Sequence, residues 1–144
     1  MHQLTEIRLV KASLDEAFEY TADFTNIEEW DPGVAKSARS DAGELGVGST
    51  FDLMVKFGPR ESPMTYTITN FEPPNRVVLE GRGSTLVAID DIRFAAVEGG
   101  TEIRYVADLH FKGFMRLVAP FIGSSLDKVG KKALDGLSGQ LGVA

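Results

Sequence analysis

The C-terminal part of the chain carries the one long hydrophobic pattern with a helical period. From Pro120 onward, apolar residues recur in steps of 3 and 4, which places them on one side of a helix of about 3.6 residues per turn. These apolar residues are Ile122, Leu126, Val129, Ala133, Leu137 and Leu141. Polar residues fall on the opposite side: Asp127, Lys128, Lys131, Lys132, Asp135 and Ser138. Such a helix needs a large apolar surface to lie on, and an antiparallel sheet is the expected partner.

Pro120 predicts a break in this helix, because proline cannot donate a hydrogen bond to the carbonyl of Arg116. A second apolar stripe precedes the proline and is rotated relative to the first; its members are Phe114, Leu117, Val118 and Phe121. We therefore expect two helical pieces with a bend. Four glycines, at positions 123, 130, 136 and 139, each weaken the helix by about 1 kcal/mol relative to alanine. Small residues on a core-facing helix can also leave open space beneath it.

The N-terminal residues predict a strand followed by two short helices. Residues 3–11 alternate as a half-buried strand does, with Thr5, Ile7 and Leu9 on one face and Glu6, Arg8 and Val10 on the other. Ser13 with Glu16 forms a capping-box pattern, which predicts a helix of about two turns that carries Ala17, Phe18 and Thr21 inward. Asp23 is expected to cap a second short helix that reaches about Glu29 and ends at Asp31-Pro32-Gly33.

Short alternating segments fill the middle of the chain and predict consecutive strands. Residues 34–40 form a weak, polar strand that fits a sheet edge, and residues 41–49 a glycine-rich turn. Further strands are expected at residues 51–57, 64–69 and 76–80, with a loop at 58–63 and a strong turn at 72–75. Gly81 to Gly83 are placed where a bulge could interrupt the last of these strands.

The last two strands predict a hairpin with a defined register around the turn Glu98-Gly99-Gly100. Apolar residues fall on one face of both strands when five pairs are formed: Phe94 with Ile103, Ile92 with Tyr105, Asp90 with Ala107, Ala88 with Leu109, and Leu86 with Phe111.

Together these elements predict an α+β fold in a single domain, residues 1–144. A curled antiparallel sheet of about seven strands, with two short helices, would grip a long C-terminal helix. A curled sheet and a helix enclose a volume between them, which side chains either fill or leave partly empty.

Composition excludes several classes of function. The chain has no cysteine and only two histidines, His2 and His110, so we expect no disulfide, no metal site and no cofactor bound through such ligands. A net charge of −6 argues against binding of nucleic acid. Glu6, Arg8 and Lys11 interrupt any secretory signal, and no apolar run is long enough for stable membrane insertion. We expect a cytoplasmic protein.

Several short motifs resemble the START-like superfamily, also called Bet v 1-like, helix-grip or SRPBCC, and within it the bacterial polyketide cyclase/dehydrase group. The likeness covers nearly the whole chain and rests on the order and spacing of these segments: Ser13-Leu14-Asp15-Glu16-Ala17-Phe18, Asp23-Phe24-Thr25-Asn26, Trp30-Asp31-Pro32, Gly46-Val47-Gly48-Ser49, Phe71-Glu72-Pro73-Pro74-Asn75-Arg76 and Gly99-Gly100-Thr101-Glu102-Ile103. The resemblance implies binding of lipids, sterols, polyketides, hormones or other apolar molecules between sheet and helix. It also implies that a minority of members catalyse cyclisation or dehydration, and that others carry lipids or quinones or dock to proteins.

Strand parity and the helical pattern single out the side chains that would face such a ligand. We expect thirteen ligand-binding residues: Trp30, Phe51, Leu53, Val55, Tyr66, Ile68, Ile92, Phe94, Tyr105, Leu109, Ile122, Leu126 and Val129. By the same parity Phe111 faces inward. Any one of these apolar residues, taken alone, is more typical of an ordinary core, and the set as a whole favours a cavity.

Asp90 is the candidate for chemistry, because the hairpin register places its carboxyl inward among apolar residues. Burial would raise its pKa and suit it to general acid or base catalysis. The alternatives are a solvated carboxyl at an open end, an ion pair with an arginine such as Arg82, or a bulge that turns Asp91 inward instead. The hydroxyls of Tyr66 and Tyr105 would either orient a ligand or bond to nearby backbone. His110 should face outward.

Three functions fit the sequence. The preferred one is binding of a small, largely apolar ligand such as a lipid or polyketide, by a carrier or sensor without chemistry. The second is an enzyme of polyketide cyclase or dehydratase type, with Asp90 as acid or base. The third is a protein-interaction module with a filled core. Ligand, reaction and oligomeric state stay open.

Overall fold

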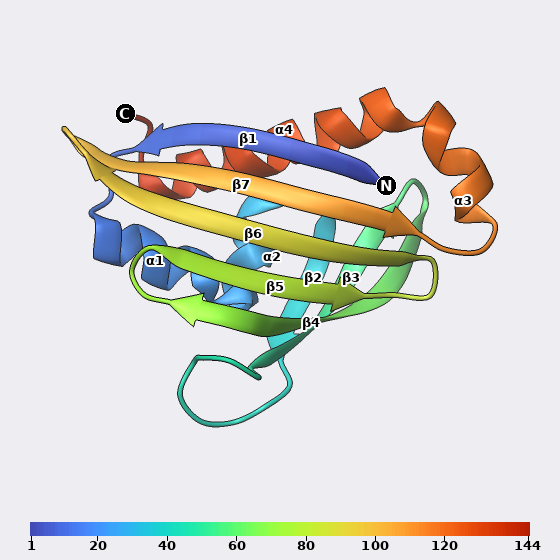
Figure 1. Ribbon diagram of the computed structural model, residues 1–144, viewed down its shortest axis with the longest axis horizontal. Coiled ribbons are helices and arrows are strands. Elements are labelled where there is room, and N and C mark those ends of the chain that lie inside the picture. Colours follow the sequence, from blue (N-terminus) through green and yellow to red (C-terminus); the bar gives the residue numbers. More distant parts are fainter.

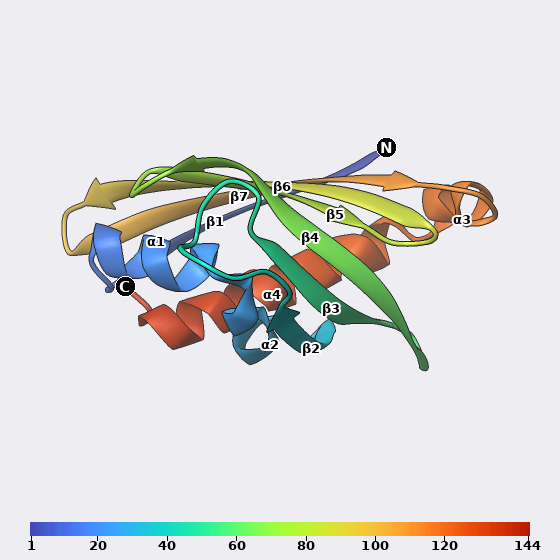
Figure 2. The same cartoon turned by 90° about the horizontal axis from the view of Figure 1, so that it is seen from below.

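A single seven-stranded antiparallel sheet forms one layer of the protein, in the order β1-β7-β6-β5-β4-β3-β2. The computed structural model describes residues 1–144. The strands are β1 (His2–Val10), β2 (Val34–Arg39), β3 (Thr50–Phe57), β4 (Arg60–Glu72), β5 (Arg76–Arg82), β6 (Leu86–Val97) and β7 (Gly100–Phe111). The sheet curls, so that β3 and β2 turn down beside the helices that occupy its concave side (Figures 1 and 2). The predicted α+β helix-grip architecture is confirmed.

The β6–β7 hairpin has the predicted register at all five pairs, from Phe94 with Ile103 to Leu86 with Phe111. The expected loop at residues 58–63 is wrong, because β4 already begins at Arg60, which pairs with Phe57. Gly58, with a positive φ of 58°, lets the chain reverse within the short turn that remains. β5 pairs regularly through Gly81, without a bulge there. The irregularity of this part of the sheet lies in β4 instead, between Ile68 and Asn70.

The N-terminal helices form where their caps predict. In α1 (Leu14–Ala22) the Glu16 amide donates to Ser13 Oγ, and in the one-turn 3₁₀ helix η1 (Phe24–Asn26) the Thr25 amide donates to Asp23 Oδ1. A short α2 (Ile27–Trp30) follows directly. Ala17, Phe18 and Thr21 are buried, as expected. These helices cover one part of the concave face and place Trp30 beneath the sheet.

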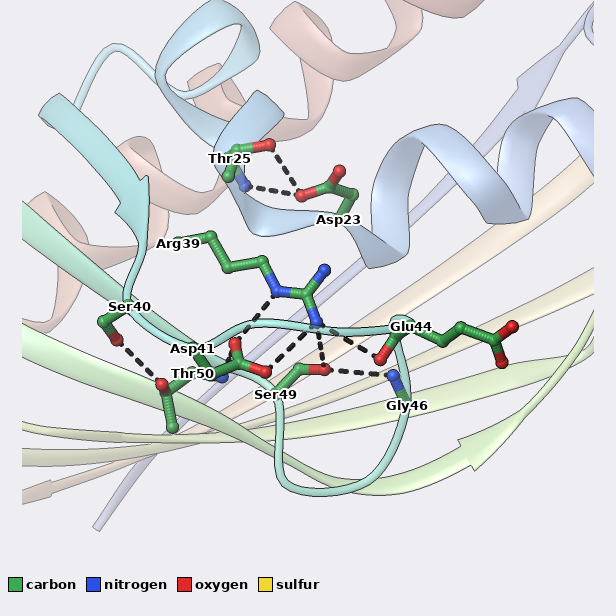
Figure 3. A network of polar contacts seen from close by, with 9 residues as sticks. All are labelled: Asp23, Thr25, Arg39, Ser40, Asp41, Glu44, Gly46, Ser49 and Thr50. Carbon is green, nitrogen blue, oxygen red and sulfur yellow. Dashed lines mark hydrogen bonds and ion pairs between the residues drawn. The ribbon is translucent and has the colours of Figure 1, made fainter.

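The glycine-rich segment between β2 and β3 is ordered by Arg39 at its base (Figure 3). The guanidinium donates to both oxygens of Asp41, at 2.9 and 3.1 Å, and to Ser49 Oγ at 3.2 Å. The Gly46 amide also donates to Ser49 Oγ. The guanidinium and the Thr50 amide hold the pKa of Asp41 at about 2. This network closes the turn between β2 and β3.

The C-terminal helix breaks at Pro120, as predicted. A short α3 (Met115–Val118) and a 3₁₀ turn, η2 (Ala119–Phe121), precede the long α4 (Gly123–Leu141). The apolar stripe before α4 does not reach the core: Phe114, Leu117 and Phe121 are 74%, 70% and 86% exposed. None of the helices is both long and apolar enough to cross a membrane.

The buried face of α4 is rotated from the predicted one. Val129 is 50% exposed, whereas Ser138, expected on the polar side, is 6% exposed; the buried residues are Gly130, Ala133, Leu134, Leu137 and Ser138. Close packing explains the rotation. A Cβ added to Gly136 would lie 1.9 Å from the Trp30 carbonyl oxygen, so glycine lets α4 approach α2. The helix therefore turns its small residues inward.

β1 attaches to α4 by charged groups on its inner face. Its buried face carries Glu6, Arg8 and Val10, while Ile7 and Leu9 are 48% and 51% exposed. Arg8 forms ion pairs with Glu6 at 2.8 Å and with Asp135 of α4 at 2.9 Å. Ile7 and Leu9 therefore mark the outer face of β1. The contact of its inner face with α4 combines these ion pairs with apolar packing of Leu4 against Gly130.

Candidate functional site

A cavity of about 330 Å³ lies between the sheet and α4, and 16 of its 24 lining residues are hydrophobic. β1, β3, β4, β6 and β7 supply one wall, and α2 and α4 supply the other. Small side chains leave the space open, because Gly33, Ala107, Gly130 and Ala133 line it where larger residues would fill it. The volume between sheet and helix is therefore partly empty.

The predicted ligand-binding residues divide into two groups. Eight line the cavity: Trp30, Val55, Tyr66, Tyr105, Leu109, Ile122, Leu126 and Val129. The other five do not line it and are packed in the core, no more than 3% exposed: Phe51, Leu53, Ile68, Ile92 and Phe94. Their side chains point to the same face of the sheet, but α1, η1 and α2 with neighbouring aromatic rings already cover them. Phe18, for example, packs against Phe94 at 5.3 Å between ring centroids.

Asp90 lies inside the cavity at 6% exposure and not at a solvated end. Tyr105 Oη donates a hydrogen bond of 2.5 Å to its Oδ2. The alternative ion pair with Arg82 does not form, since Arg82 bonds to Glu80. Asp91 faces the other side of the sheet, where Arg76 and Arg93 hold its pKa below the usual range despite partial burial. Of the two neighbouring aspartates, it is Asp90 that the sheet turns inward.

Burial dominates the electrostatics of Asp90 and raises its pKa to about 7. The hydrogen bond from Tyr105 acts in the opposite direction, because it stabilises the carboxylate. Nearby negative charge on Asp31 and Asp108 adds to the increase. The carboxyl is thus poised to exchange a proton near neutral pH, which is the property a general acid or base requires.

Asp31 is a second carboxyl of this cavity, and the sequence placed it only in a turn. Its Oδ1 accepts a hydrogen bond of 2.8 Å from the Gly33 amide, in the turn that ends α2. Burial raises its pKa to about 6, and the Gly33 hydrogen bond lowers it. The signal in the sequence was its position directly after Trp30, which was itself expected to face the ligand.

Three aromatic side chains accompany the two carboxyls. Tyr105 donates to Asp90 and not to backbone, so its hydroxyl belongs to the cavity. The Tyr66 ring lies directly over Gly81, where a Cβ would come within 2.4 Å of it, so this glycine makes room for the ring. Burial and the charge of Asp90 raise the pKa of both phenols well above the usual range. Trp30 Nε1 is buried without a hydrogen-bond partner.

Other titratable groups contribute less to the site. Glu6 and Lys56 also line the cavity, and Glu6 is paired with Arg8 at 2.8 Å. His110 is exposed on the outer face of β7, as its parity indicated. No group of three or more histidine, aspartate or glutamate side chains is placed to hold a metal ion. The site can therefore offer an apolar enclosure, two aspartyl carboxyls and two phenols.

Solved structures of several other proteins superpose on nearly the whole of this chain. The Zhui aromatase/cyclase from Streptomyces sp. R1128 superposes with a TM-score of 0.81 at 12% identity, covering 97% of this chain and 93% of that one. A START superfamily protein from Mycobacterium smegmatis gives 0.80 at 14%, covering 98% and 97%. Ara h 8.0201 gives 0.65 at 14%, covering 97% of both chains. The TM-scores and the coverage show that these proteins share the fold of this chain.

Sequence comparison adds the family. No curated protein matches this sequence. The family described as "Polyketide cyclase / dehydrase and lipid transport" matches residues 1–142, nearly the whole chain. This match, together with the helix-grip architecture, confirms the resemblance seen in the short motifs. The chain belongs to the polyketide cyclase / dehydrase and lipid transport family.

Proposed function

We propose that the protein binds a small, largely apolar molecule in the cavity between its sheet and α4, and acts as a carrier or sensor of that molecule. The observation that supports this most directly is the cavity itself, about 330 Å³ with mainly hydrophobic walls. That size lies at the lower end of small-molecule sites, which suits a compact ligand or one end of a longer chain. A protein that served only as an interaction module would be expected to have a filled core, without a cavity of this size.

Native mass spectrometry of the purified protein, combined with titration of a hydrophobic fluorescent dye, tests the proposal. We expect co-purified apolar material or saturable dye binding at one site. Ala107→Leu should block the cavity, because Ala107 lines it at 6% exposure. Ala95→Leu, on the exposed side of β6, is the matched control that should bind as wild type does. A clean apo mass with no dye binding, or equal binding by both variants, would contradict the proposal.

A second candidate function is acid–base catalysis of cyclisation or dehydration within the same cavity. The pair formed by Asp90 and Tyr105 favours it, since a buried carboxyl with a pKa of about 7 can both accept and return a proton. One structural neighbour is an aromatase/cyclase, which agrees with such chemistry at the level of the fold. A β-keto substrate, whose enolisation requires proton transfer next to a carbonyl, is the chemical class this pair would serve.

A screen of poly-β-keto substrates with wild type and Asp90→Asn separates the two candidates. If the protein is an enzyme, product formation should fall by roughly 100-fold or more in the variant, as for removal of a general acid or base, while dye binding stays. Turnover that is unchanged in Asp90→Asn would remove Asp90 from the mechanism. Absence of turnover with every substrate would leave the carrier as the better reading.

A further inference from the structure

The two aspartates that line the cavity have no positively charged partner within the chain. Asp90 accepts a hydrogen bond from the neutral Tyr105 hydroxyl, and Asp31 accepts one from the Gly33 amide. Neither carboxylate takes part in an ion pair. Buried carboxylates are normally paired, because an unpaired charge in apolar surroundings is costly. The cavity therefore lacks the cation that its carboxyls would require when ionised.

Aromatic rings occupy the same part of the cavity. The Trp30 and Tyr105 rings meet edge to face with centroids 6.2 Å apart, and Tyr66 lines the same wall. Tyr105 is hydrogen-bonded to Asp90 and its ring packs against Trp30, which Asp31 follows directly in the chain, so carboxyls and rings share one wall region of the cavity. Aromatic faces attract cations, and rings that surround a small space are the usual means of holding an organic ammonium group.

No basic side chain in or next to the lining supplies the missing cation. Arg8 does not line the cavity and is paired with Glu6 and Asp135. Lys56, the one basic residue in the lining, is exposed on β3 and forms no ion pair with either aspartate. A fatty acid or a phosphate ester whose head group lay beside the two aspartates would thus bring a negative charge toward acidic groups, and the only basic side chain of the lining is the exposed Lys56.

We propose that this cavity takes an apolar ligand that carries an organic ammonium group. The ammonium lies against the carboxyls and rings of Asp31, Asp90, Trp30, Tyr66 and Tyr105, and the hydrocarbon part fills the apolar remainder between the sheet and α4. Binding ionises both carboxyls, because the ligand's positive charge compensates them. This inference rests on the proposed ligand-binding function and names the chemical class of the ligand.

Three unbranched probes with ten carbon atoms each test the head group at neutral pH: decylamine, 1-decanol and decanoate. Trp30 is the only tryptophan of the chain and lines the cavity, so its fluorescence reports binding directly, with calorimetry as a second readout. We expect decylamine to bind roughly tenfold or more tightly than 1-decanol, since both an ion pair and cation–π contacts are gained in a desolvated site. Decanoate should bind most weakly.

Removal of the two carboxyl charges should remove most of this preference, because only the contacts with the aromatic rings remain. In Asp31→Asn/Asp90→Asn, the affinity for decylamine should fall close to that for 1-decanol, which itself should change little. The matched control is Glu19→Gln/Glu98→Gln, which removes two exposed charges outside the cavity and should keep the preference. Should the double variant fail to fold, the order of the three affinities on the wild-type protein still tests whether the cavity prefers an ammonium group.

The outcomes separate the two proposals. If 1-decanol and decanoate bind as well as decylamine, the ammonium inference is wrong while the apolar cavity keeps its function. If the preference for decylamine persists undiminished in the aspartate double variant, or disappears in the control variant, its cause is net charge and not the cavity carboxyls. Either result also overturns the inference. If no probe binds, both the inference and the proposed function fail.

Discussion

One face of one sheet is solidly packed over part of its area and hollow over the rest. β6 crosses from one region to the other: Phe94 and Ile92 are packed in the core, whereas Asp90 and Leu86 line the cavity. The packed region is covered by α1 and by aromatic side chains such as Phe18, which contacts Phe71 and Phe94. The hollow region is covered by α4, whose inner face offers glycine and alanine.

The difference shows that the covering element decides between core and cavity. Both regions have inward-facing apolar side chains in the same strand parity. A helix with phenylalanine fills the space, while a helix with Gly130 and Ala133 does not. Polar groups are tolerated where the space stays open, which is why Asp90 and the two tyrosines are found there. Four changes test this contrast, and the first should alter the free energy of unfolding most and the last least.

Truncation of equivalent phenylalanines should have unequal effects in the two regions. Phe94→Ala removes a 3% exposed ring from close aromatic contacts and should lower the free energy of unfolding by about 3–5 kcal/mol. Phe111→Ala removes a half-buried ring from the cavity wall, where fewer contacts are lost, and should cost about 1–2 kcal/mol. Denaturant unfolding of both variants measures this, and equal losses would mean that the cavity is filled in solution.

The buried carboxyl of Asp90 should make stability depend on pH. Its folded pKa of about 7 lies above the ordinary value of 3.8, so the folded state holds a proton that the unfolded state has released. The contribution of Asp90 to stability is therefore full below about pH 4 and is lost as pH rises toward 7, by on the order of 3–4 kcal/mol. Asp90→Asn should remove most of this slope, and Asp31, with a pKa of about 6, should account for a smaller remainder.

Unfolding curves collected at several pH values between about 4.5 and 7.5 check this prediction. The window avoids the range in which Asp41, with a pKa of about 2, protonates. Glu98→Gln, at an exposed turn, is the control that should keep the wild-type slope. A wild-type protein whose stability does not change with pH would show that water reaches Asp90 freely.

Loss of the Tyr105 hydroxyl should have an intermediate effect. Tyr105→Phe removes the hydrogen bond that stabilises the Asp90 carboxylate, so the pKa of Asp90 should rise further. At neutral pH we expect a loss of about 1–2 kcal/mol. Infrared or NMR titration of the carboxyl measures the shift, and Tyr20→Phe, whose hydroxyl bonds to Glu29 outside the cavity, is the matched control. A pKa that falls in Tyr105→Phe would contradict the described geometry.

Filling the hollow region should change binding much more than stability. In Ala107→Leu the added atoms enter open space, so the free energy of unfolding should stay within about 1 kcal/mol of wild type. Affinity for the hydrophobic dye should fall by roughly tenfold or more because the volume is occupied. A large loss of stability together with retained dye binding would place the ligand elsewhere.

Local features of the sequence were sufficient for much of the fold. The register of the β6–β7 hairpin follows from alternation and one turn, and the caps at Ser13 and Asp23 follow from short side chains next to backbone amides. Pro120 breaks the last helix for a reason carried by its own ring. These features act over a few residues, so no knowledge of distant partners was needed to predict them. The inward direction of Asp90 belongs to the same class.

The division into core and cavity was decided by tertiary structure. Strand parity states which face a side chain points to, but not what lies opposite, so Phe51 and Ile68 looked the same as Val55 and Leu109 in the sequence. The rotation of α4, which exposes Val129 and buries Ser138, depends on the contact of Gly136 with Trp30. Asp31 lies in the same cavity as Asp90 because the neighbouring Trp30 packs against Tyr105 of β7. Such distances arise from packing between segments far apart in the chain, where no local pattern records them.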